Sequence, residues 1–321
     1  MIRDDDIDPA PLRGKTVAII GFGNQGRAQA SNLRDSGVEV CVGLRDGSAR
    51  ITEAQEAGLN VMAPAQAARR ADLVMLLAPD ERLASIYDLV APSLKEGAAI
   101  GFSHGLAIHF GLIQPRLDLD VIMVAPKGPG TALRSLYQEE RGMVALAAVA
   151  QDASGGAWPL ALAYARAIGC GRAGVIGSTF EEECVADLFN EQAVVWGAVP
   201  AILQAGFDAL VETGVQPQVA YLECVAELKL LADLVEARGL AGTAEAISNT
   251  AELGALLGGA RLVDERVRWE MRRVLDEIKA GRFAQQLSDE ADADYPRLRA
   301  ARKQARQTAV ERARIALAGD N

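Results

Sequence analysis

Residues 16–44 constrain the fold more than any other part of the chain. A short apolar run, TVAII, is followed at once by the glycine pattern GFGNQG, then by a helical run and a second apolar run, VEVCVGL. This order of strand, glycines, helix and strand is typical of a dinucleotide-binding βαβ unit. Gly21 would make the tight turn, Gly23 would let the backbone approach a pyrophosphate, and Gly26 would let helix and strand pack closely. An ordinary glycine turn in an α/β domain is the alternative.

The segment after the second strand predicts which dinucleotide is bound. An acidic residue at this point would hold the ribose 2′-hydroxyl of NAD. The chain instead reads LRDGSAR, which offers the guanidiniums of Arg45 and Arg50 and the hydroxyl of Ser48. Arginine forks suit a 2′-phosphate in charge and geometry, so NADP is favoured over NAD. Asp46 could repel that phosphate or orient one of the arginines, and a solvated surface loop is the alternative interpretation.

The hydrophobic pattern predicts two domains. Apolar strands alternate with helical segments up to about residue 180, which is the signature of an α/β domain with a doubly wound, mostly parallel sheet. We expect domain 1–180 to bind NADP and domain 181–321 to be all helical, with breaks at Gly214, Gly239, Gly258 and Pro296. Strands are expected at residues 16–20, 38–44, 72–79, 98–102, 121–125, 143–149 and 174–176, with helices at 27–34, 52–57 and 81–91.

Four carboxylates on the predicted helices suggest a metal site. Asp187 and Glu191 are spaced i,i+4, as are Glu223 and Glu227, so each pair projects from one side of its helix. The acids stand among apolar residues, where desolvation would make unpaired carboxylates costly. Hard oxygen ligands with room for water suit Mg²⁺. Solvated acids on amphipathic helices are the alternative for either pair alone.

Two polar segments follow predicted strands, at the edge where open parallel sheets bind ligands. Ser103-His104-Gly105 follows the strand AAIGF, and Lys127 lies in PKGPG after VIMVA. His104 is placed for polar chemistry, whereas His109 in the same segment has the more apolar surroundings of a core histidine. Lys127 could orient a polar group or bind an anion, or it could be an ordinary surface lysine.

Charge and cysteine use exclude several functions. The net charge of −10 argues against a nucleic-acid partner. We find no apolar run near the length of a membrane span and no signal peptide at the N-terminus. Four scattered cysteines without metal-ligand spacing are expected to be buried hydrophobes in a reducing cytoplasm: Cys41, Cys170, Cys184 and Cys224.

The sequence resembles the short form of the ketol-acid reductoisomerase family over nearly its full length. The resemblance rests on the segments GFGNQGRAQASNLRDSG, VGLRDGS, FSHGLAIHFG, DVIMVAPKGPG, QDASG, RAGVIGSTF, DLFNEQAV, ECVAELKLLADL and AISNTAE. It implies an NADP-binding Rossmann domain followed by an all-helical, knotted domain that dimerisation completes. The partners implied are a small-molecule substrate and a second copy of the chain in a homodimer or larger homo-oligomer.

The resemblance also implies the reaction. A magnesium-dependent alkyl shift in 2-acetolactate or a similar acid would be followed by NADPH-dependent reduction to a 2,3-dihydroxy acid, a precursor of branched-chain amino acids. Two Mg²⁺ ions would be held by Asp187, Glu191, Glu223 and Glu227. The remaining roles also carry over by resemblance: Ser248 would bind the substrate carboxylate, His104, Lys127 and Glu227 would take part in catalysis, and Gly21, Gly23, Gln25, Gly26, Arg45, Ser48 and Arg50 would bind the cofactor.

Some positions depart from the family pattern. Trp196 stands where a small residue or cysteine is usual, and residues 243–246 differ near the expected pocket. Neither change removes an implied metal ligand, so we expect the metal and cofactor chemistry to be retained and the substrate preference to shift with the pocket. An NADP-dependent hydroxyacid dehydrogenase and a non-catalytic NADP-binding homologue are the alternatives, and the four acids argue against both.

Overall fold

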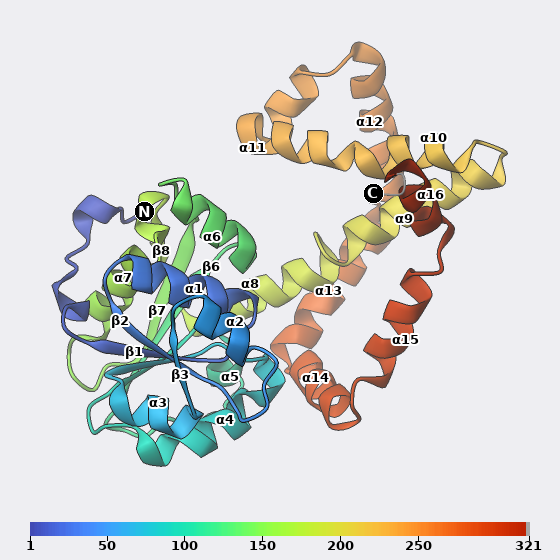
Figure 1. Ribbon diagram of the computed structural model, residues 1–321. Helices are drawn as coiled ribbons and strands as arrows, with labels where there is room; N and C mark the ends of the chain where they lie inside the picture. The colour runs from blue at the N-terminus through green and yellow to red at the C-terminus, as the bar shows by residue number, and fades with distance from the viewer. Residues whose placement is uncertain (319–321) are drawn as a thin grey trace. The chain divides into compact units, whose positions relative to one another are not determined.

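The computed structural model describes residues 1–318, and the chain divides into two compact units, Met1–Ala186 and Asp187–Asn321 (Figure 1). The two units differ in secondary structure. The first is a sheet with helices on both faces, and the second is helical throughout its described part. The predicted combination of an α/β domain and a helical domain is confirmed.

The first unit is built on one eight-stranded sheet in the order β3-β2-β1-β4-β5-β6-β7-β8. Six of its seven strand pairs are parallel, and β7 runs antiparallel to β6. From β1 the chain continues to β2 and β3 on one side of β1, and it then returns to form β4 on the other side of β1. This reversal creates a topological switch point between β1 and β4. The strands are β1 Thr16–Ile20, β2 Glu39–Gly43, β3 Asn60–Met62, β4 Leu73–Leu76, β5 Ala99–Phe102, β6 Asp120–Pro126, β7 Ala145–Gln151 and β8 Val175–Gly177.

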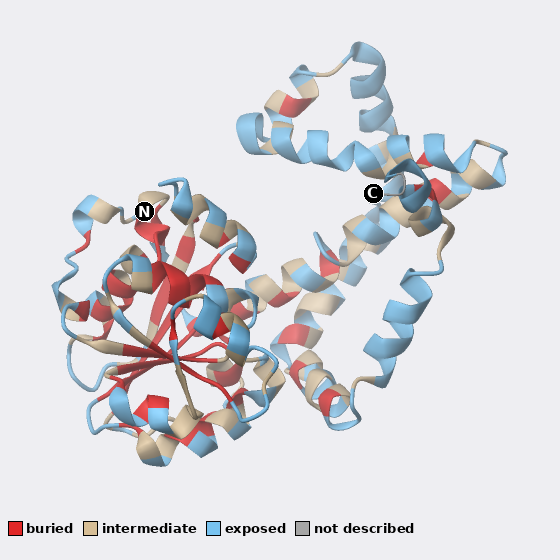
Figure 2. Ribbon diagram, viewed as in Figure 1, coloured by how far each residue is buried: buried red, intermediate tan, exposed pale blue. Residues whose placement is uncertain are grey.

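Alternating side chains of each strand serve two separate cores. Ile19 and Met75 pack with α1, α6 and α7 on one face of the sheet. Ile20 and Leu76 pack with α3, α4 and α5 on the other, and both sets are fully buried (Figure 2). The helices of this unit are α1 Asn24–Asp35, α2 Ile51–Glu56, α3 Pro64–Arg70, α4 Leu83–Val90, α5 Leu106–His109, α6 Gly130–Gln138 and α7 Ala157–Ala167.

Five short 3-10 helices join these elements: η1 Asp4–Asp6, η2 Ala10–Leu12, η3 Asp80–Arg82, η4 Ala91–Ser93 and η5 Cys170–Arg172. The sequence analysis did not predict the strand β3 or the helices α3, α5, α6 and α7. A three-residue strand shows no alternation, and PAQAARR is too short and alanine-rich to show a helical apolar stripe. Both β3 and α3 lie against β2, so their structure depends on packing with that strand rather than on their own sequence pattern.

The second unit is a chain of helices. Its elements are α8 Phe180–Ala193, which begins in the first unit, α9 Ala198–Glu212, α10 Pro217–Tyr221, the π-helix η6 Leu222–Ala226, α11 Leu228–Glu245, α12 Asn249–Leu262, α13 Glu265–Lys279, α14 Arg282–Asp292, α15 Pro296–Ala305 and α16 Ala309–Ala318. Gly214 and Gly239 have positive φ at breaks, and Pro296 starts a helix, as predicted. The break predicted at Gly258 is wrong, because α12 runs through it.

The second unit buries little apolar surface by itself. A small core joins Phe207 of α9, Ala220 of α10 and Ala313 of α16. Most of the exposed large hydrophobic residues of the chain lie in this unit, and Figure 2 shows its helices mostly in the exposed colour. Leu240 and Leu256, for example, are exposed on α11 and α12. Helices with apolar side chains on open faces normally require a covering surface.

One stretch is apolar and long enough to cross a membrane by length and composition. It lies within Phe180–Glu212, where the most apolar 18-residue window has a mean hydropathy of 1.6 and is 6% buried. The expectation that the chain holds no such stretch is therefore wrong. A single helix of this kind is weak evidence for a span, and the stretch opens with three consecutive acids, Glu181, Glu182 and Glu183.

Candidate active site at the carboxyl edge of the sheet

Two of the predicted polar residues meet on one buried carboxylate. His104 follows β5, Lys127 follows β6, and Glu183 lies in the first turns of α8. His104 Nδ1 lies 2.9 Å from Glu183 Oε2, and Lys127 Nζ donates to Glu183 Oε1 at 3.1 Å. The backbone N–H of Gly105 also donates to Oε2, at 2.7 Å. Both oxygens of Glu183, a residue 1% exposed, are thus bonded to donors.

These contacts keep Glu183 ionised. Burial alone would raise the pKa of its carboxyl group, but the hydrogen bond and charge of His104, the charge of Lys127 and the N–H of Gly105 outweigh burial and lower that pKa. A buried carboxylate is tolerated only when it is paired and hydrogen-bonded in this way. Glu183 therefore fixes the positions of His104 and Lys127 at the edge of the sheet.

The same contacts assign the protons of His104. An ionised carboxylate only accepts hydrogen bonds, so Nδ1 of His104 must carry the proton shared with Glu183. The other ring nitrogen, Nε2, is then the one that is left to exchange a proton with a substrate. His109, expected to be a core residue, is half-buried at the end of α5 with its ring 4.6 Å from that of Phe110.

Asp187 joins this group from the next turn of the same helix. One ligand atom each of His104, Glu183 and Asp187 lies within 4.8 Å of the others, which is close enough to surround a cation. Glu191 stands one turn further along α8 and is exposed. Since both oxygens of Glu183 are committed to donors, Asp187 is the carboxylate of the group best suited to a hard divalent cation.

The sequence analysis missed Glu183. It lies in the run FEEEC at the start of a helix, where acids are common because they favour the positive end of the helix dipole. A signal was nevertheless present: Glu183, Asp187 and Glu191 continue one i,i+4 series along a single face. The prediction rested on pairs of acids and did not include the N-terminal member of this series.

The second pair of acids lies on a distorted helix. Glu223 is inside η6, whose π-helical turn widens the backbone, and Glu227 is its C-cap residue. Such π-turns are frequent at functional sites. Glu191, Glu223 and Glu227 are all exposed, so the expectation that they are desolvated is wrong for the chain by itself. The apolar neighbours expected to desolvate them, such as Leu222 and Leu228, are exposed as well.

Ser248 is an exposed residue at the start of α12. It is the N-cap, and its hydroxyl accepts a hydrogen bond from the N–H of Ala251 at 3.2 Å. This contact alone explains a serine at the position, since serine is a favoured N-cap. A role in substrate binding stays a prediction.

The three glycines of the turn after β1 have the geometry that a dinucleotide needs. Gly21 has φ +104°, and a Cβ there would meet the backbone oxygen of Leu77 at 2.7 Å. A Cβ on Gly26 would lie 2.4 Å from the backbone oxygen of Gly21, so the close packing of α1 on β1 requires glycine. A Cβ on Gly23 would meet nothing within 4 Å, which leaves open space beside the backbone at the start of α1.

Gln25 connects this glycine turn to the Lys127 segment. Its side-chain amide donates to the backbone oxygen of Gly128 at 2.9 Å and accepts from Gln29 at 3.0 Å. Gln29 is fully buried, donates to Ser103 Oγ at 2.9 Å and accepts from the hydroxyl of Tyr164 at 2.6 Å. A satisfied buried network of this kind makes its surroundings rigid. Gln25 thus has a structural contact at the position predicted to contact cofactor.

The loop after β2 carries the predicted 2′-phosphate residues. Arg45 is exposed, Ser48 Oγ accepts from the N–H of Arg50 at 3.3 Å, and the guanidinium of Arg50 donates to Glu53 at 2.8 Å. A cavity of about 690 Å³ lies beside this loop. Its lining extends from Gly23 at the glycine turn to Arg50 and Glu53, so it is placed where a dinucleotide bound at Gly23 would continue.

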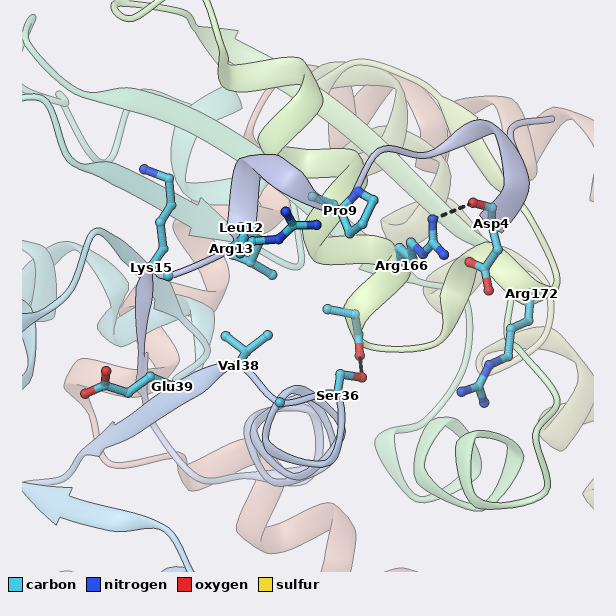
Figure 3. A pocket seen from close by; sticks show the side chains of 14 residues that line it. Asp4, Pro9, Leu12, Arg13, Lys15, Ser36, Val38, Glu39, Arg166 and Arg172 are labelled. Atoms are coloured by element: carbon cyan, nitrogen blue, oxygen red, sulfur yellow. Dashed lines mark hydrogen bonds between the residues drawn. The ribbon is translucent and has the colours of Figure 1, made fainter.

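A second cavity lies at the opposite edge of the sheet. It measures about 530 Å³ and is lined by residues just before β1 and β2, such as Lys15 and Val38 (Figure 3). Arg166 there donates to the backbone oxygen of Asp4 at 2.9 Å. Because open α/β sheets bind ligands at the carboxyl ends of their strands, this cavity is not the candidate active site.

None of the four cysteines forms a disulfide. Cys41, Cys170 and Cys184 are buried and Cys224 is half-buried. Burial raises the pKa of the Cys170 thiol to about 12, with Asp4 contributing. The three buried cysteines behave as small core hydrophobes, as expected, whereas Cys224 is only partly buried.

Both parts of the chain match known families. The profile described as "Acetohydroxy acid isomeroreductase, NADPH-binding domain" matches residues 11–174, and that described as "Ketol-acid reductoisomerase, C-terminal domain" matches residues 180–318. The "Ketol-acid reductoisomerase (NADP(+))" of Kineococcus radiotolerans is 47% identical over 312 residues, which are 97% of this chain and 91% of that protein.

Solved structures agree with this match. An NADH-preferring ketol-acid reductoisomerase from an uncultured archaeon has a TM-score of 0.94 at 42% identity, covering 97% of this chain and 96% of that one. The pyrroline carboxylate reductase of Plasmodium falciparum, solved with NADP bound, has a TM-score of 0.55 at 13% identity, covering 84% and 98%. At that identity the second likeness concerns the fold alone.

Proposed function

Because the chain belongs to the ketol-acid reductoisomerase family, we propose that it isomerises 2-acetolactate-type acids and reduces the product at the edge where His104, Lys127, Glu183 and Asp187 meet. This meeting of a histidine, a lysine and two carboxylates beside a dinucleotide turn is the observation that carries the proposal. Residues 1–180 would bind the cofactor and residues 181–321 would supply further metal and substrate ligands. Turnover of 2-acetolactate with oxidation of NADPH is the direct test.

NADPH fits the first unit. Its pyrophosphate would lie against Gly23 and the free N–H groups at the start of α1, where no side chain intrudes. Gly21 and Gly26 would shape the turn, Gln25 would hold it against Gly128, and Arg45, Ser48 and Arg50 would reach the 2′-phosphate. NADPH supplies the hydride for the reduction. The relatives above are named for different dinucleotides, so the preference of this chain depends on its own residues.

Magnesium fits the oxygen ligands on α8. Asp187 would hold Mg²⁺ beside His104 and Glu183, with Glu191 one turn away. Glu223, Glu227 and Ser248 would complete the metal and substrate ligands, contributed by the partner subunit. Mg²⁺ stabilises negative charge that develops on substrate oxygens during an alkyl shift.

Side chains of the first unit would exchange protons with the substrate and orient one another. Glu183 would hold the imidazole of His104 by Nδ1, so that Nε2 exchanges the proton that the substrate loses or gains. The same carboxylate would keep the ammonium of Lys127 at the edge of the sheet, where its charge can stabilise a substrate oxygen. Glu227 would take part in catalysis together with His104 and Lys127, close to the bound substrate.

The exposed apolar helices support a homodimer. Leu240, Leu256 and Leu262 are open on α11 and α12, as is Trp196 after α8. A second copy of the chain would cover these faces and would desolvate the exposed acids near them. In an interlocked, knotted arrangement of the two copies, this contact would extend along several helices. No contact with a membrane or with nucleic acid is proposed, and cysteines that form no disulfide suit the cytoplasm.

Sedimentation should therefore give a mass at least twice the 33.9 kDa of the chain at micromolar concentration. Leu256→Glu should shift the protein towards the monomer, because a charge is costly inside an apolar interface. Leu117→Glu is the matched control, since Leu117 is an exposed leucine of the first unit. A wild-type protein that sediments as a monomer would rule the dimer out.

Trp196 and residues 243–246 would alter substrate preference within this function. Trp196 is 68% exposed on the chain, whereas Thr243 is buried with its hydroxyl bonded to the backbone oxygen of Gly239. An exposed tryptophan brought to a pocket by the partner would fill much of its volume. Relative kcat/KM values for 2-acetolactate and larger homologues test this, and a normal preference for 2-acetolactate would refute it.

A further inference from the structure

Glu53 lines the cavity that runs from the glycine turn to the loop after β2. It lies on α2, and its carboxylate forms ion pairs with two arginines from different elements. Arg27 of α1 contacts Oε1, and Arg50, just before α2, donates to Oε2 at 2.8 Å. All three residues line the same cavity of about 690 Å³, together with Gly23.

The third arginine of this cavity is committed elsewhere. Arg134 of α6 donates to the side chain of Asn32 at 2.8 Å and pairs with Asp35 at 2.6 Å. Arg27 and Arg50 are therefore the two cations of the cavity that share Glu53, and one carboxylate neutralises half of their joint charge. Asp46, on the loop after β2, is exposed and has no ion pair among the described residues 1–318.

We propose that Glu53 determines the preference between NADP and NAD by competing with the 2′-phosphate for Arg27 and Arg50. This inference rests on the proposed function, because it concerns how the same cofactor site treats the adenosine ribose. A 2′-phosphate carries about two negative charges and binds guanidiniums in the same bidentate way as a carboxylate. NAD has a hydroxyl at this position, so it can bind while Glu53 keeps both arginines.

The exposure of the pairs makes this competition possible. The side chains of Arg27 and Arg50 are 47% and 55% exposed, and that of Glu53 is 30% exposed. Ion pairs this open are individually weak, because water screens them. A ligand phosphate can therefore take over the arginines, but part of its binding free energy is lost to the separation from Glu53.

The test compares two probes that differ only in the 2′-phosphate, adenosine 2′,5′-bisphosphate and adenosine 5′-monophosphate, by calorimetry on the full-length protein. Glu53→Gln should tighten binding of the bisphosphate by about three- to tenfold, and it should change binding of the monophosphate by less than about twofold. The ratio of kcat/KM for NADPH to that for NADH should rise by a similar factor. Glu56→Gln is the matched control, since Glu56 is exposed on the same helix and does not line the cavity.

Other outcomes distinguish a failure of the cofactor site from a failure of the role of Glu53. If the wild-type protein binds neither probe, the cofactor site itself is misassigned and the inference fails with it. If both probes bind but Glu53→Gln leaves the bisphosphate unchanged or weakens it, the role of Glu53 is overturned while the cofactor site stands. An equal gain for both probes, or an equal gain from Glu56→Gln, would mean a general charge effect. A selective gain from Asp46→Asn alone would assign the preference to Asp46.

Discussion

The variant Glu183→Gln should lose at least about a hundredfold in kcat for 2-acetolactate while its KM for NADPH changes little. Glu183 bonds His104 and Lys127 through different oxygens, and a glutamine can offer only one acceptor oxygen. Its NH₂ group would face one of these donors, so either the imidazole or the ammonium would turn away. Removing a group that orients a functional side chain typically lowers activity 10- to 100-fold. Here two such side chains, His104 and Lys127, depend on one carboxylate.

Glu181→Gln provides the control for this variant, because Glu181 is an exposed acid on the same helix. Both variants remove one negative charge from the start of α8, so a general charge effect would act on both alike. Circular dichroism and dinucleotide binding should match wild type in both. A Glu183→Gln enzyme with near-normal kcat would show that His104 and Lys127 do not depend on Glu183 for their positions.

The variant Asp187→Asn should lose on the order of a thousandfold in turnover of 2-acetolactate, since a metal that stabilises developing charge contributes several kcal/mol. The group that could hold a metal contains two carboxylates, Glu183 and Asp187. Both oxygens of Glu183 already accept hydrogen bonds, so Asp187 is the better metal ligand. An asparagine keeps the shape but loses the charge that a hard cation needs. Residual activity should require far more Mg²⁺ for half-saturation than the wild-type enzyme does.

Magnesium titrations of the rate and direct Mg²⁺ binding by calorimetry measure this effect. Glu212→Gln is a suitable control, because Glu212 is an exposed acid at the end of α9. If Asp187→Asn retained wild-type Mg²⁺ affinity, the cation would have to be held by other residues. If it lost activity without any change in Mg²⁺ affinity, Asp187 would act on the substrate rather than on the metal.

The sequence predicted the first unit well because its strands are fully buried on both faces. Such strands appear as continuous apolar runs, and β1, β4, β5 and β6 were all recognised in that way. The orientation of β7 was not predictable from its own residues. A strand that reverses direction keeps the same apolar composition, and only pairing with β6 shows that it runs antiparallel.

The second unit was predicted as helical, but its finer breaks were not. Gly258 lies inside α12, because a single glycine costs a helix only about 1 kcal/mol. The π-turn at Leu222–Ala226 left no recognisable sequence signal, since LECVA has ordinary helix-forming residues. Such a turn depends on how α10 and α11 pack, and that information is not local.

The site was predicted in part. His104, Lys127 and Asp187 were predicted from strand ends and helical spacing, and the structure brings these residues together around Glu183. The position of Glu183 depends on long-range geometry, because α8 must pass the ends of β5 and β6. The run of three acids concealed it, since only burial distinguishes Glu183 from the exposed Glu181 and Glu182.

The reductoisomerase function can be tested by measuring NADPH oxidation with 2-acetolactate, with and without Mg²⁺, and beside the isomerised intermediate 3-hydroxy-3-methyl-2-oxobutanoate. We expect Mg²⁺-dependent turnover of both compounds, with 2-acetolactate turnover abolished when Mg²⁺ is chelated. Turnover of the intermediate alone would contradict the isomerase function and leave only a reductase. Turnover of neither, in a protein that still binds NADPH, would contradict catalysis at the group formed by His104, Lys127, Glu183 and Asp187.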